Sequence, residues 1–172
     1  MWVNCILRSG LLLVILSVAI ASHKEVSFTK SCRSKETLVP AVDSLFVKVA
    51  WLKASVPEDR IRTIRLLKKK TKKLFMENCR FQEQLLSFFI EDVFAQLQLQ
   101  TCKEIYFVED FHSLRQKLIN CIPCSSSSKE MKSITRIRRT FYRIGKKGIY
   151  KAIGELDILL SWIKNFLESI IF

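Results

Sequence analysis

The chain has 172 residues, which is enough for one domain with a sizeable hydrophobic core. Hydrophobic residues make up 49%, which excludes an intrinsically disordered chain, and only four Gly and three Pro favour long helices over a turn-rich β-sandwich. The formal net charge of +13 favours a polyanionic partner, such as nucleic acid, a heparin-like glycan or an anionic membrane.

Residues 1–21 have the composition of a secretory signal peptide. Arg8 precedes an apolar run that ends at Ile20, and the small residues around Ile20 predict cleavage after Ala21. The alternative is a signal anchor that stays in the membrane, but the run is shorter than the ~20 residues that span a bilayer. Residues 22–172 are then one predicted helical domain with 28 basic and 16 acidic residues and a net charge of +12.

Secretion would place the remaining cysteines in an oxidising compartment, where they pair. These are Cys32, Cys79, Cys102, Cys121 and Cys124, and their odd number leaves one over. Cys121 and Cys124 match a CxxC redox motif, but Cys121 ends an apolar-periodic segment, whereas a redox thiolate lies at a helix N-terminus. The two histidines show no spacing for zinc, so structural disulfides are the favoured interpretation.

Helical spacing of apolar residues begins in the first half of the chain. A first helix is predicted over 38–52, with Leu38, Val42, Leu45, Val49 and Leu52 on its apolar face. Ser55 and Glu58 are spaced as a capping box, with Pro57 in the first turn, and this predicts a short second helix from that point.

A basic cluster without any acid follows. Its eight residues are Arg60, Arg62, Arg65, Lys68, Lys69, Lys70, Lys72 and Lys73. On a helix, several of these side chains share one face opposite Ile64, Leu67 and Leu74, which would form a positive stripe. The alternative interpretation of the same run is a merely solvated face.

The second half of the chain continues with predicted helices. A long one covers 75–97, another runs from about Glu109 to Cys121, and a capping box at Ser127 and Glu130 begins the next. That helix carries a second cluster of eight basic residues, with Glu130 the one acid among them: Lys129, Lys132, Arg136, Arg138, Arg139, Arg143, Lys146 and Lys147.

The last predicted helix begins near Gly148, after a break at Gly145, and has the clearest apolar stripe. The stripe consists of Ile149, Ile153, Leu156, Leu160 and Ile163, with Leu159 beside it. Lys151, Glu155 and Asp157 lie away from this stripe, so we expect them at the surface. No segment alternates as a strand and no internal repeat is present, which predicts an all-α fold.

The sequence contains none of the arrangements that support catalysis. It has no Gly-rich phosphate loop, no GxSxG elbow and no carboxylate–histidine pair at a useful spacing. Glu155 and Asp157 are two residues apart, so a helix would direct them differently. We therefore expect a non-enzymatic protein without a cofactor.

The last helix resembles a known family. Gly148-Ile149-Tyr150-Lys151-Ala152-Ile153, followed by Glu155-Leu156-Asp157, is similar to the C-terminal signature of the interleukin-10 cytokine family. The segment Asn78-Cys79-Arg80-Phe81, the long helix after it and the Cys121/Cys124 pair fit the same pattern, and the resemblance covers the whole mature chain. It implies a six-helix class II cytokine bundle that binds a heteromeric class II cytokine receptor and signals through Janus kinases and STAT factors.

The resemblance also implies particular contacts. Family members use the first helix, the loop after it and the last helix against the higher-affinity receptor chain, and the second chain would be the widely shared short one. The residues at matching positions are Asp43, Ser44, Lys48, Lys151, Glu155 and Asp157.

Two further features follow from the resemblance. It pairs Cys32 with Cys121 and Cys79 with Cys124, and leaves Cys102 outside the pattern. It also implies a homodimer that exchanges its last two helices, because the link 125–128 is short, although some relatives are monomers.

The rival interpretation is a cationic host-defence protein that binds polyanions and membranes, and it depends on the basic clusters alone. Heparin-like glycans and DNA of any sequence would be its ligands, since no fold motif for base recognition is present. The residues predicted to bind them are Arg60, Arg62, Arg65, Lys68, Lys69, Lys70, Lys72, Lys73, Arg136, Arg138, Arg139 and Arg143. Glycan capture and receptor binding are compatible in one protein.

Overall fold

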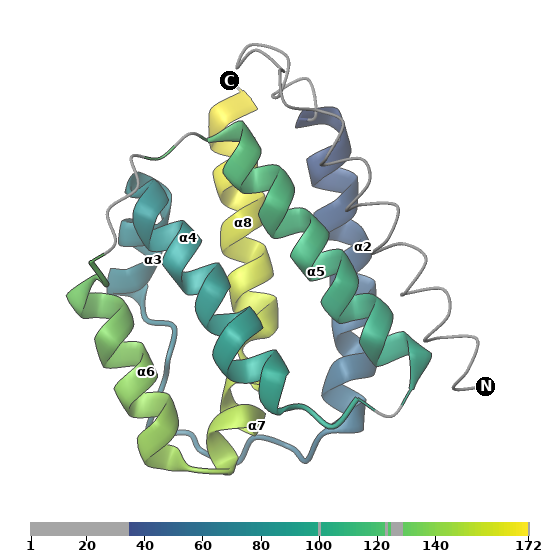
Figure 1. Cartoon of the computed structure of the whole chain (residues 1–172), viewed down its shortest axis with the longest axis vertical. Coiled ribbons are helices and arrows are strands. Elements are labelled where there is room, and N and C mark those ends of the chain that lie inside the picture. Colours follow the sequence, from purple (N-terminus) through teal and green to yellow (C-terminus); the bar gives the residue numbers. More distant parts are fainter. Residues whose placement is uncertain (1–34, 100, 123, 125–128, 172) are drawn as a thin grey trace.

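The computed structural model describes residues 35–99, 101–122, 124 and 129–171, so the signal peptide predicted for 1–21 lies outside the described residues. Every regular element within the described ranges is helical, and the predicted all-α fold is confirmed (Figure 1). The elements are α2 (Lys35–Ser55), α3 (Lys69–Glu77), α4 (Cys79–Phe88), the π-helix η2 (Phe89–Val93), the 3₁₀-helix η3 (Phe94–Gln96), α5 (Cys102–Cys121), α6 (Lys132–Ile144), α7 (Lys147–Gly154) and α8 (Leu156–Ile171). None of the helices in this part of the chain combines the length and apolar character that a membrane crossing requires.

Helix α8 lies in the middle of the bundle, with α2 on one side, α3 and α4 on the other, and α5 crossing in front (Figure 1). The predicted apolar faces form the core. On α2 the five predicted positions from Leu38 to Leu52 are at most 5% exposed. On α8, Leu156, Leu159, Leu160 and Ile163 are fully buried. The two apolar stripes pack against each other, and this burial stabilises α2 and α8, because isolated helices are only marginally stable in water.

The long helix predicted over 75–97 is broken into several elements. Asn78 is extended (φ −133°), ends α3 and caps α4, because its side chain accepts a hydrogen bond from the Phe81 amide at 2.9 Å. After Phe88 the helix widens into a π-turn and then tightens into a 3₁₀-turn. Phe75, Leu85, Leu86, Phe88, Phe89 and Val93 of the predicted range are buried, as the apolar spacing there predicts. An aromatic core forms where Phe88, Phe89 and Phe94 meet Phe107 and Phe111 of α5 and Phe141 of α6, with neighbouring ring centroids 5.1–6.5 Å apart.

The short helix predicted to start at Ser55 does not exist. Ser55 is the last residue of α2, and its hydroxyl donates to the Leu52 carbonyl oxygen at 2.8 Å, so it closes a helix and does not open one. Residues 57–62 have no regular structure, and the next helix begins only at Lys69. The predicted positive stripe along one helix therefore does not form. The lysines of α3 are helical, but Arg60, Arg62 and Arg65 lie in the irregular segment before it.

Two helix starts also differ from the prediction. Helix α5 begins at Cys102 and not near Glu109, because Thr101 and Glu104 form a reciprocal capping box that the sequence analysis missed. Helix α6 begins at Lys132, and Ser127 of its predicted capping box lies outside the described residues. The break before α7 is as predicted: Gly145 follows α6 with φ +66°, a conformation that favours glycine.

The disulfide between Cys79 and Cys124 is confirmed, with 5.9 Å between the Cα atoms. It ties the start of α4 to the chain beyond α5. Cys102 is also disulfide-bonded, so the expectation that it stands outside the pairing pattern is wrong. Cys79 and Cys124 bond each other, so in the predicted mature chain only Cys32 or Cys121 is left to bond Cys102, and the predicted Cys32–Cys121 pair is contradicted. Cys32 lies outside the described residues, and peptide mapping of unreduced protein identifies the partner of Cys102.

Replacing Cys79 and Cys124 together by Ser should lower the free energy of unfolding by about 4 kcal/mol, because the bond closes a loop across a sequence separation of 45. Urea unfolding of the double variant and of the wild type measures this difference. The same comparison under reducing conditions is the control, where the two proteins should unfold at similar urea concentrations. An unchanged midpoint under oxidising conditions would contradict the stabilising role of this bond.

Candidate functional site

Three parts of the chain meet where α7 passes into α8. Residue Glu155 lies between these helices with φ −100° and ψ 5°, and its amide donates to carbonyl oxygens of α7. The segment 56–68, which links α2 to α3, passes over this junction. The Glu155 carboxylate accepts hydrogen bonds from the amides of Leu66 at 3.1 Å and Leu67 at 2.8 Å. The junction thus holds the end of the segment that leads into α3.

Lys151 holds the beginning of the same segment. Its Nζ lies 3.0 Å from Asp59 Oδ2, 2.8 Å from the Ile61 carbonyl oxygen and 3.2 Å from Glu155 Oε1. Lys151 and Glu155 are only 5% and 4% exposed. Buried charges are tolerated when they are paired and hydrogen-bonded, and both conditions are met here.

The expectation that Lys151 and Glu155 lie at the surface is therefore wrong. They do lie off the apolar stripe, but segment 56–68 covers that side of the helix. Burial raises the pKa of the Glu155 carboxyl, against the opposing effects of the Leu67 and Leu66 amides and of Lys151. Both residues act in the described structure as anchors for the segment.

Asp157 remains accessible at the start of α8. Its carboxylate pairs with Lys53 at the end of α2 at 3.0 Å, and its side chain is 50% exposed. Further along the same two helices, Asp43 of α2 pairs with Lys164 of α8 at 2.7 Å. The seam between α2 and α8 therefore presents two half-exposed ion pairs, and we call it the α2/α8 seam.

The predicted residues of the first helix do not all face this seam. Asp43 lies on it, whereas Lys48 bonds Asp110 of α5 and so faces the opposite neighbour of α2. Ser44 is exposed. The structure brings Asp43 and Asp157 onto one seam and separates Lys48 from them.

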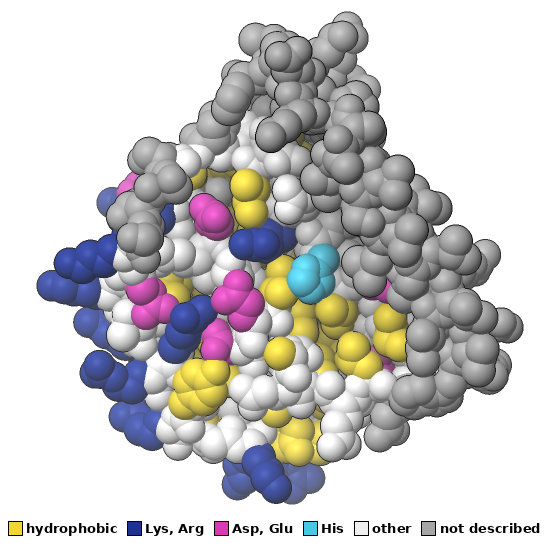
Figure 2. All heavy atoms as spheres, viewed as in Figure 1, with side chains coloured by type: hydrophobic (Ala, Val, Ile, Leu, Met, Phe, Trp, Pro, Cys, Tyr) yellow, Lys and Arg dark blue, Asp and Glu magenta, His cyan; other side chains and the backbone are white. Residues whose placement is uncertain are grey.

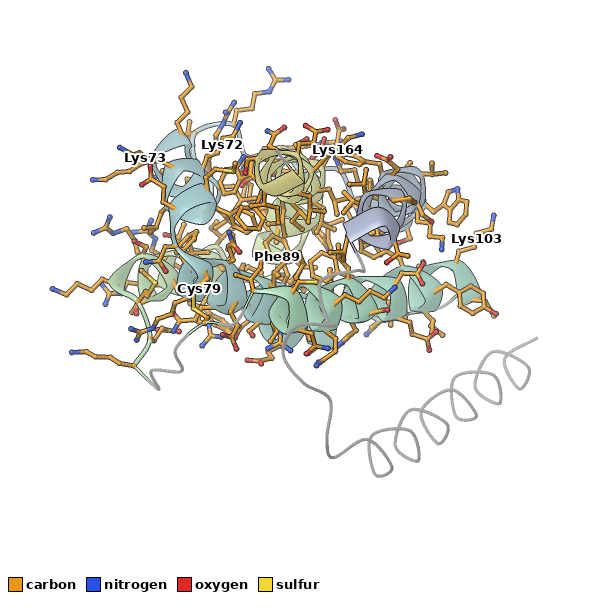
Figure 3. The ribbon with its side chains drawn as sticks, turned by 90° about the horizontal axis from the view of Figure 1, so that it is seen from above. Lys72, Lys73, Cys79, Phe89, Lys103 and Lys164 are labelled. Atoms are coloured by element: carbon orange, nitrogen blue, oxygen red, sulfur yellow. A yellow bond between two sulfur atoms is a disulfide. The ribbon has the colours of Figure 1, made fainter. Side chains whose placement is uncertain are left out.

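The basic clusters gather on one side of the molecule. Helices α3 and α6 both lie on the left in Figure 1, and dark-blue Lys and Arg side chains follow that edge in Figure 2. In the view from above, Lys72 and Lys73 point away from the bundle (Figure 3). Among the described residues, no acid pairs with any basic side chain of the first cluster. We call the exposed residues of both clusters the basic surface.

Arg138 does not belong to this surface, although it was predicted to bind polyanions. Its guanidinium lies 2.9 Å from Asp92, 2.9 Å from Glu130 and 3.6 Å from Glu91. Two of these acids come from the π-helix η2, far away in the sequence, so local charge counting could not find them. Arg136, Arg139 and Arg143 are exposed and remain available.

The described residues form an all-helical bundle with an internal disulfide and a charged seam between α2 and α8, which agrees with the helical cytokine fold that the resemblance implies. A sequence model of the family described as Interleukin 10 matches residues 6–169, and the chain belongs to this family. It is accordingly a secreted cytokine and not an enzyme.

Individual relatives agree with this membership. The chain is 75% identical over 169 residues to human interleukin-26, covering 98% of this chain and 99% of the relative. It is 28% identical over 96 residues to feline interleukin-10, covering 52% of each chain. A viral interleukin-10 homolog of equine herpesvirus 2 is 26% identical over 99 residues, covering 53% of this chain and 54% of the relative. The segments LLKKKTKK, QEQLLSFF and EDFHSLRQKL, which point to interleukin-26 within the family, agree with the first of these results.

Proposed function

We propose that the protein binds a heteromeric class II cytokine receptor that includes the widely shared short chain, and that binding triggers JAK–STAT signalling. The observation that carries this proposal is the 75% identity to human interleukin-26 over 98% of the chain. The α2/α8 seam, with segment 56–68 beside it, is the surface that meets the higher-affinity receptor chain. Asp43, Ser44 and Asp157 supply its accessible polar contacts, and Lys48 extends the contact around α2.

A signalling assay tests this proposal. Cells that express pairs of class II receptor chains are treated with the protein, and STAT phosphorylation is measured. The expected result is a response from one pair that includes the short chain, and none from cells that carry either chain alone. A response that persists without any of these chains would contradict the proposal.

The second proposed activity is binding of polyanions, heparin-like glycans and DNA alike, by the basic surface. Its support is the concentration of exposed, unneutralised Lys and Arg on the side of α3 and α6 (Figure 2). Because phosphate and sulfate groups are the targets, the base sequence of the DNA should matter little.

Replacing Lys68, Lys69, Lys70, Lys72 and Lys73 by Gln should weaken heparin and DNA binding together and flatten the dependence on salt. Each phosphate contact contributes about 0.9 to the slope of log affinity against log salt for B-DNA, so the slope should fall by up to about 4.5. A salt titration of both affinities, for wild type and variant, measures this change. Equal slopes would show that the run is only a solvated face.

A matched pair of variants separates position from total charge. Lys73→Gln and Lys103→Gln each remove one positive charge. Lys103 lies at the far end of α5, away from Lys72 and Lys73 (Figure 3). We expect only the first variant to lower the slope, and an equal effect of both would mean that net charge alone controls binding.

The alternative function, a host-defence protein that attacks membranes, meets a physical obstacle in α6. The apolar face of this helix is occupied in the core, where Ile134, Ile137 and Phe141 are at most 5% exposed. The folded protein therefore offers a membrane its charge but not this apolar face. Killing of bacteria by a protein that binds no receptor chain would favour the alternative.

Exchange of helices between two copies is part of the proposal as well. The chain packs α6 against α4 and α8 against α2, and the same contacts would form between two copies that exchanged the helices after the link 125–128. Light scattering at low micromolar concentration decides the matter, with the mass of two chains as the expected result and the mass of one chain as the contrary one.

A further inference from the structure

Segment 56–68 is attached to the last two helices at both of its ends. Near its beginning, Asp59 and the Ile61 carbonyl oxygen bind Lys151 of α7. Near its end, the amides of Leu66 and Leu67 bind Glu155. Lys151 and Glu155 also pair with each other, so one buried unit of two side chains holds both attachments. We call Asp59, Lys151 and Glu155 the clamp.

The part of the segment between the attachments carries charge to the surface. Arg62, Thr63 and Arg65 are exposed, while Ile61 and Ile64 are half-buried and Leu66 and Leu67 are buried. Without regular hydrogen bonding of its own, such a segment would sample many conformations, and ordering it on binding would oppose affinity. The clamp removes that freedom before a partner arrives.

Gly154 indicates independently that segment 56–68 packs closely against α7. A Cβ atom at this position would come within 3.1 Å of the Asp59 Cβ, which is closer than ordinary contact between side chains. The helix thus has no side chain at the point where Asp59 crosses it. Gly154→Ala should push Asp59 away from Lys151 while leaving Glu155 unchanged.

We propose that Lys151 and Glu155 are positioning residues that hold segment 56–68 in its receptor-binding form, and that neither one touches the receptor. The inference rests on the proposed receptor function. It separates two kinds of residue within one stretch of sequence: Asp157, exposed on the α2/α8 seam, meets the partner, whereas Lys151 and Glu155, buried beneath the segment, shape the surface that the partner meets.

Glu155→Gln tests the clamp. Both backbone amides donate to Oε2 of Glu155, so the amide oxygen of Gln is a neutral and weaker acceptor for them, and the NH2 group of Gln would face the Lys151 ammonium in place of Oε1. Hydrogen exchange of the Leu66 and Leu67 amides should become at least tenfold faster, while exchange in the middle of α5 stays unchanged. Affinity for the higher-affinity receptor chain should fall at least tenfold.

Further variants protect the test against simple unfolding and against direct contact. Asp59→Asn with Lys151→Met and Glu155→Gln removes all three charges of the clamp, so no unpaired charge remains there, and this variant should fold and still loosen the segment. Asp157→Asn is the matched control two residues away: it should lower receptor affinity without any change in exchange at Leu66 and Leu67. Gly154→Ala should loosen the attachment at Asp59 and lower receptor affinity with the Glu155 carboxylate intact.

Three results would overturn the inference. Unchanged exchange with unchanged affinity in Glu155→Gln would mean that the clamp holds nothing. Faster exchange with unchanged affinity would mean that the order of the segment is irrelevant to the receptor. Lower affinity with unchanged exchange would mean that Glu155 touches the receptor itself. If the wild type bound no receptor chain, the proposed function would fail, whereas the exchange measurement would still show whether Glu155 orders the segment.

Discussion

Glu155→Lys should lower the free energy of unfolding by about 3–5 kcal/mol, the range typical of breaking a buried ion pair from one side. The substitution removes the acceptor of the Leu66 and Leu67 amides and places a second ammonium beside Lys151, which is 5% exposed. Two buried amides then lose their acceptor, and Lys151 keeps Asp59 and the Ile61 carbonyl oxygen but loses one carboxylate and gains a like charge beside it. Urea unfolding followed by circular dichroism measures the loss.

Asp157→Lys is the control for this experiment. It reverses the same charge two residues along the chain, at a side chain that is 50% exposed and paired only at the surface. Its effect on stability should stay within about 1 kcal/mol. If Glu155→Lys were as stable as Asp157→Lys, the burial of the clamp would not contribute to the fold as the contacts indicate.

Asp43→Lys with Asp157→Lys should weaken binding to the higher-affinity receptor chain by about 2–5 kcal/mol, which is roughly 30-fold to several thousand-fold in the dissociation constant. Both carboxylates are half-exposed on the α2/α8 seam. Reversal turns each surface ion pair into a pair of like charges, which changes the charge of the seam while the core beneath it stays intact. Surface plasmon resonance with the receptor ectodomain measures the affinity.

Two acids on other elements provide the matched control. Glu77→Lys with Glu83→Lys makes the same change in net charge on α3 and α4, away from the seam. This variant should retain full affinity for the receptor chain. Equal weakening by both double variants would show that long-range repulsion, and not the seam, determines the effect.

The helices of the core could be predicted because each one carries its own apolar stripe. The five positions of α2 from Leu38 to Leu52 and the stripe of α8 are buried as the spacing predicts. Periodicity within one helix reports which side is apolar, and the bundle buries that side. Helix ends were predicted less well where a polar side chain decides them, as Asn78 does between α3 and α4.

Segment 56–68 could not be predicted in the same way, because its form depends on partners about ninety residues away. The spacing of Arg62, Arg65 and Lys69 fits a helix, yet the amides that a helix would need are bound to Glu155. The spacing in the last helix predicts Lys151 and Glu155 at the surface, because an apolar stripe shows only which side of its own helix faces the core. The hydrophobic pattern of the last helix does not indicate that segment 56–68 covers its polar side.

Arg138 shows the same limit for the basic surface. Its spacing among Arg136, Arg139 and Arg143 predicts a solvent-facing cation, but η2 directs Glu91 and Asp92 toward it. Counting charges along the chain considers only neighbours in sequence, whereas the acids that neutralise Arg138 are brought to it by tertiary packing.

Binding of the secreted protein to a panel of class II cytokine receptor ectodomains tests the central claim most directly. The panel should contain the shared short chain, alone and together with each longer chain, at physiological salt so that non-specific attraction by the basic surface is screened. We expect tight binding to one longer chain and a stronger, ternary complex when the short chain is added, both lost in Asp43→Lys with Asp157→Lys. Binding to no ectodomain, or binding that this variant retains in full, would contradict the account.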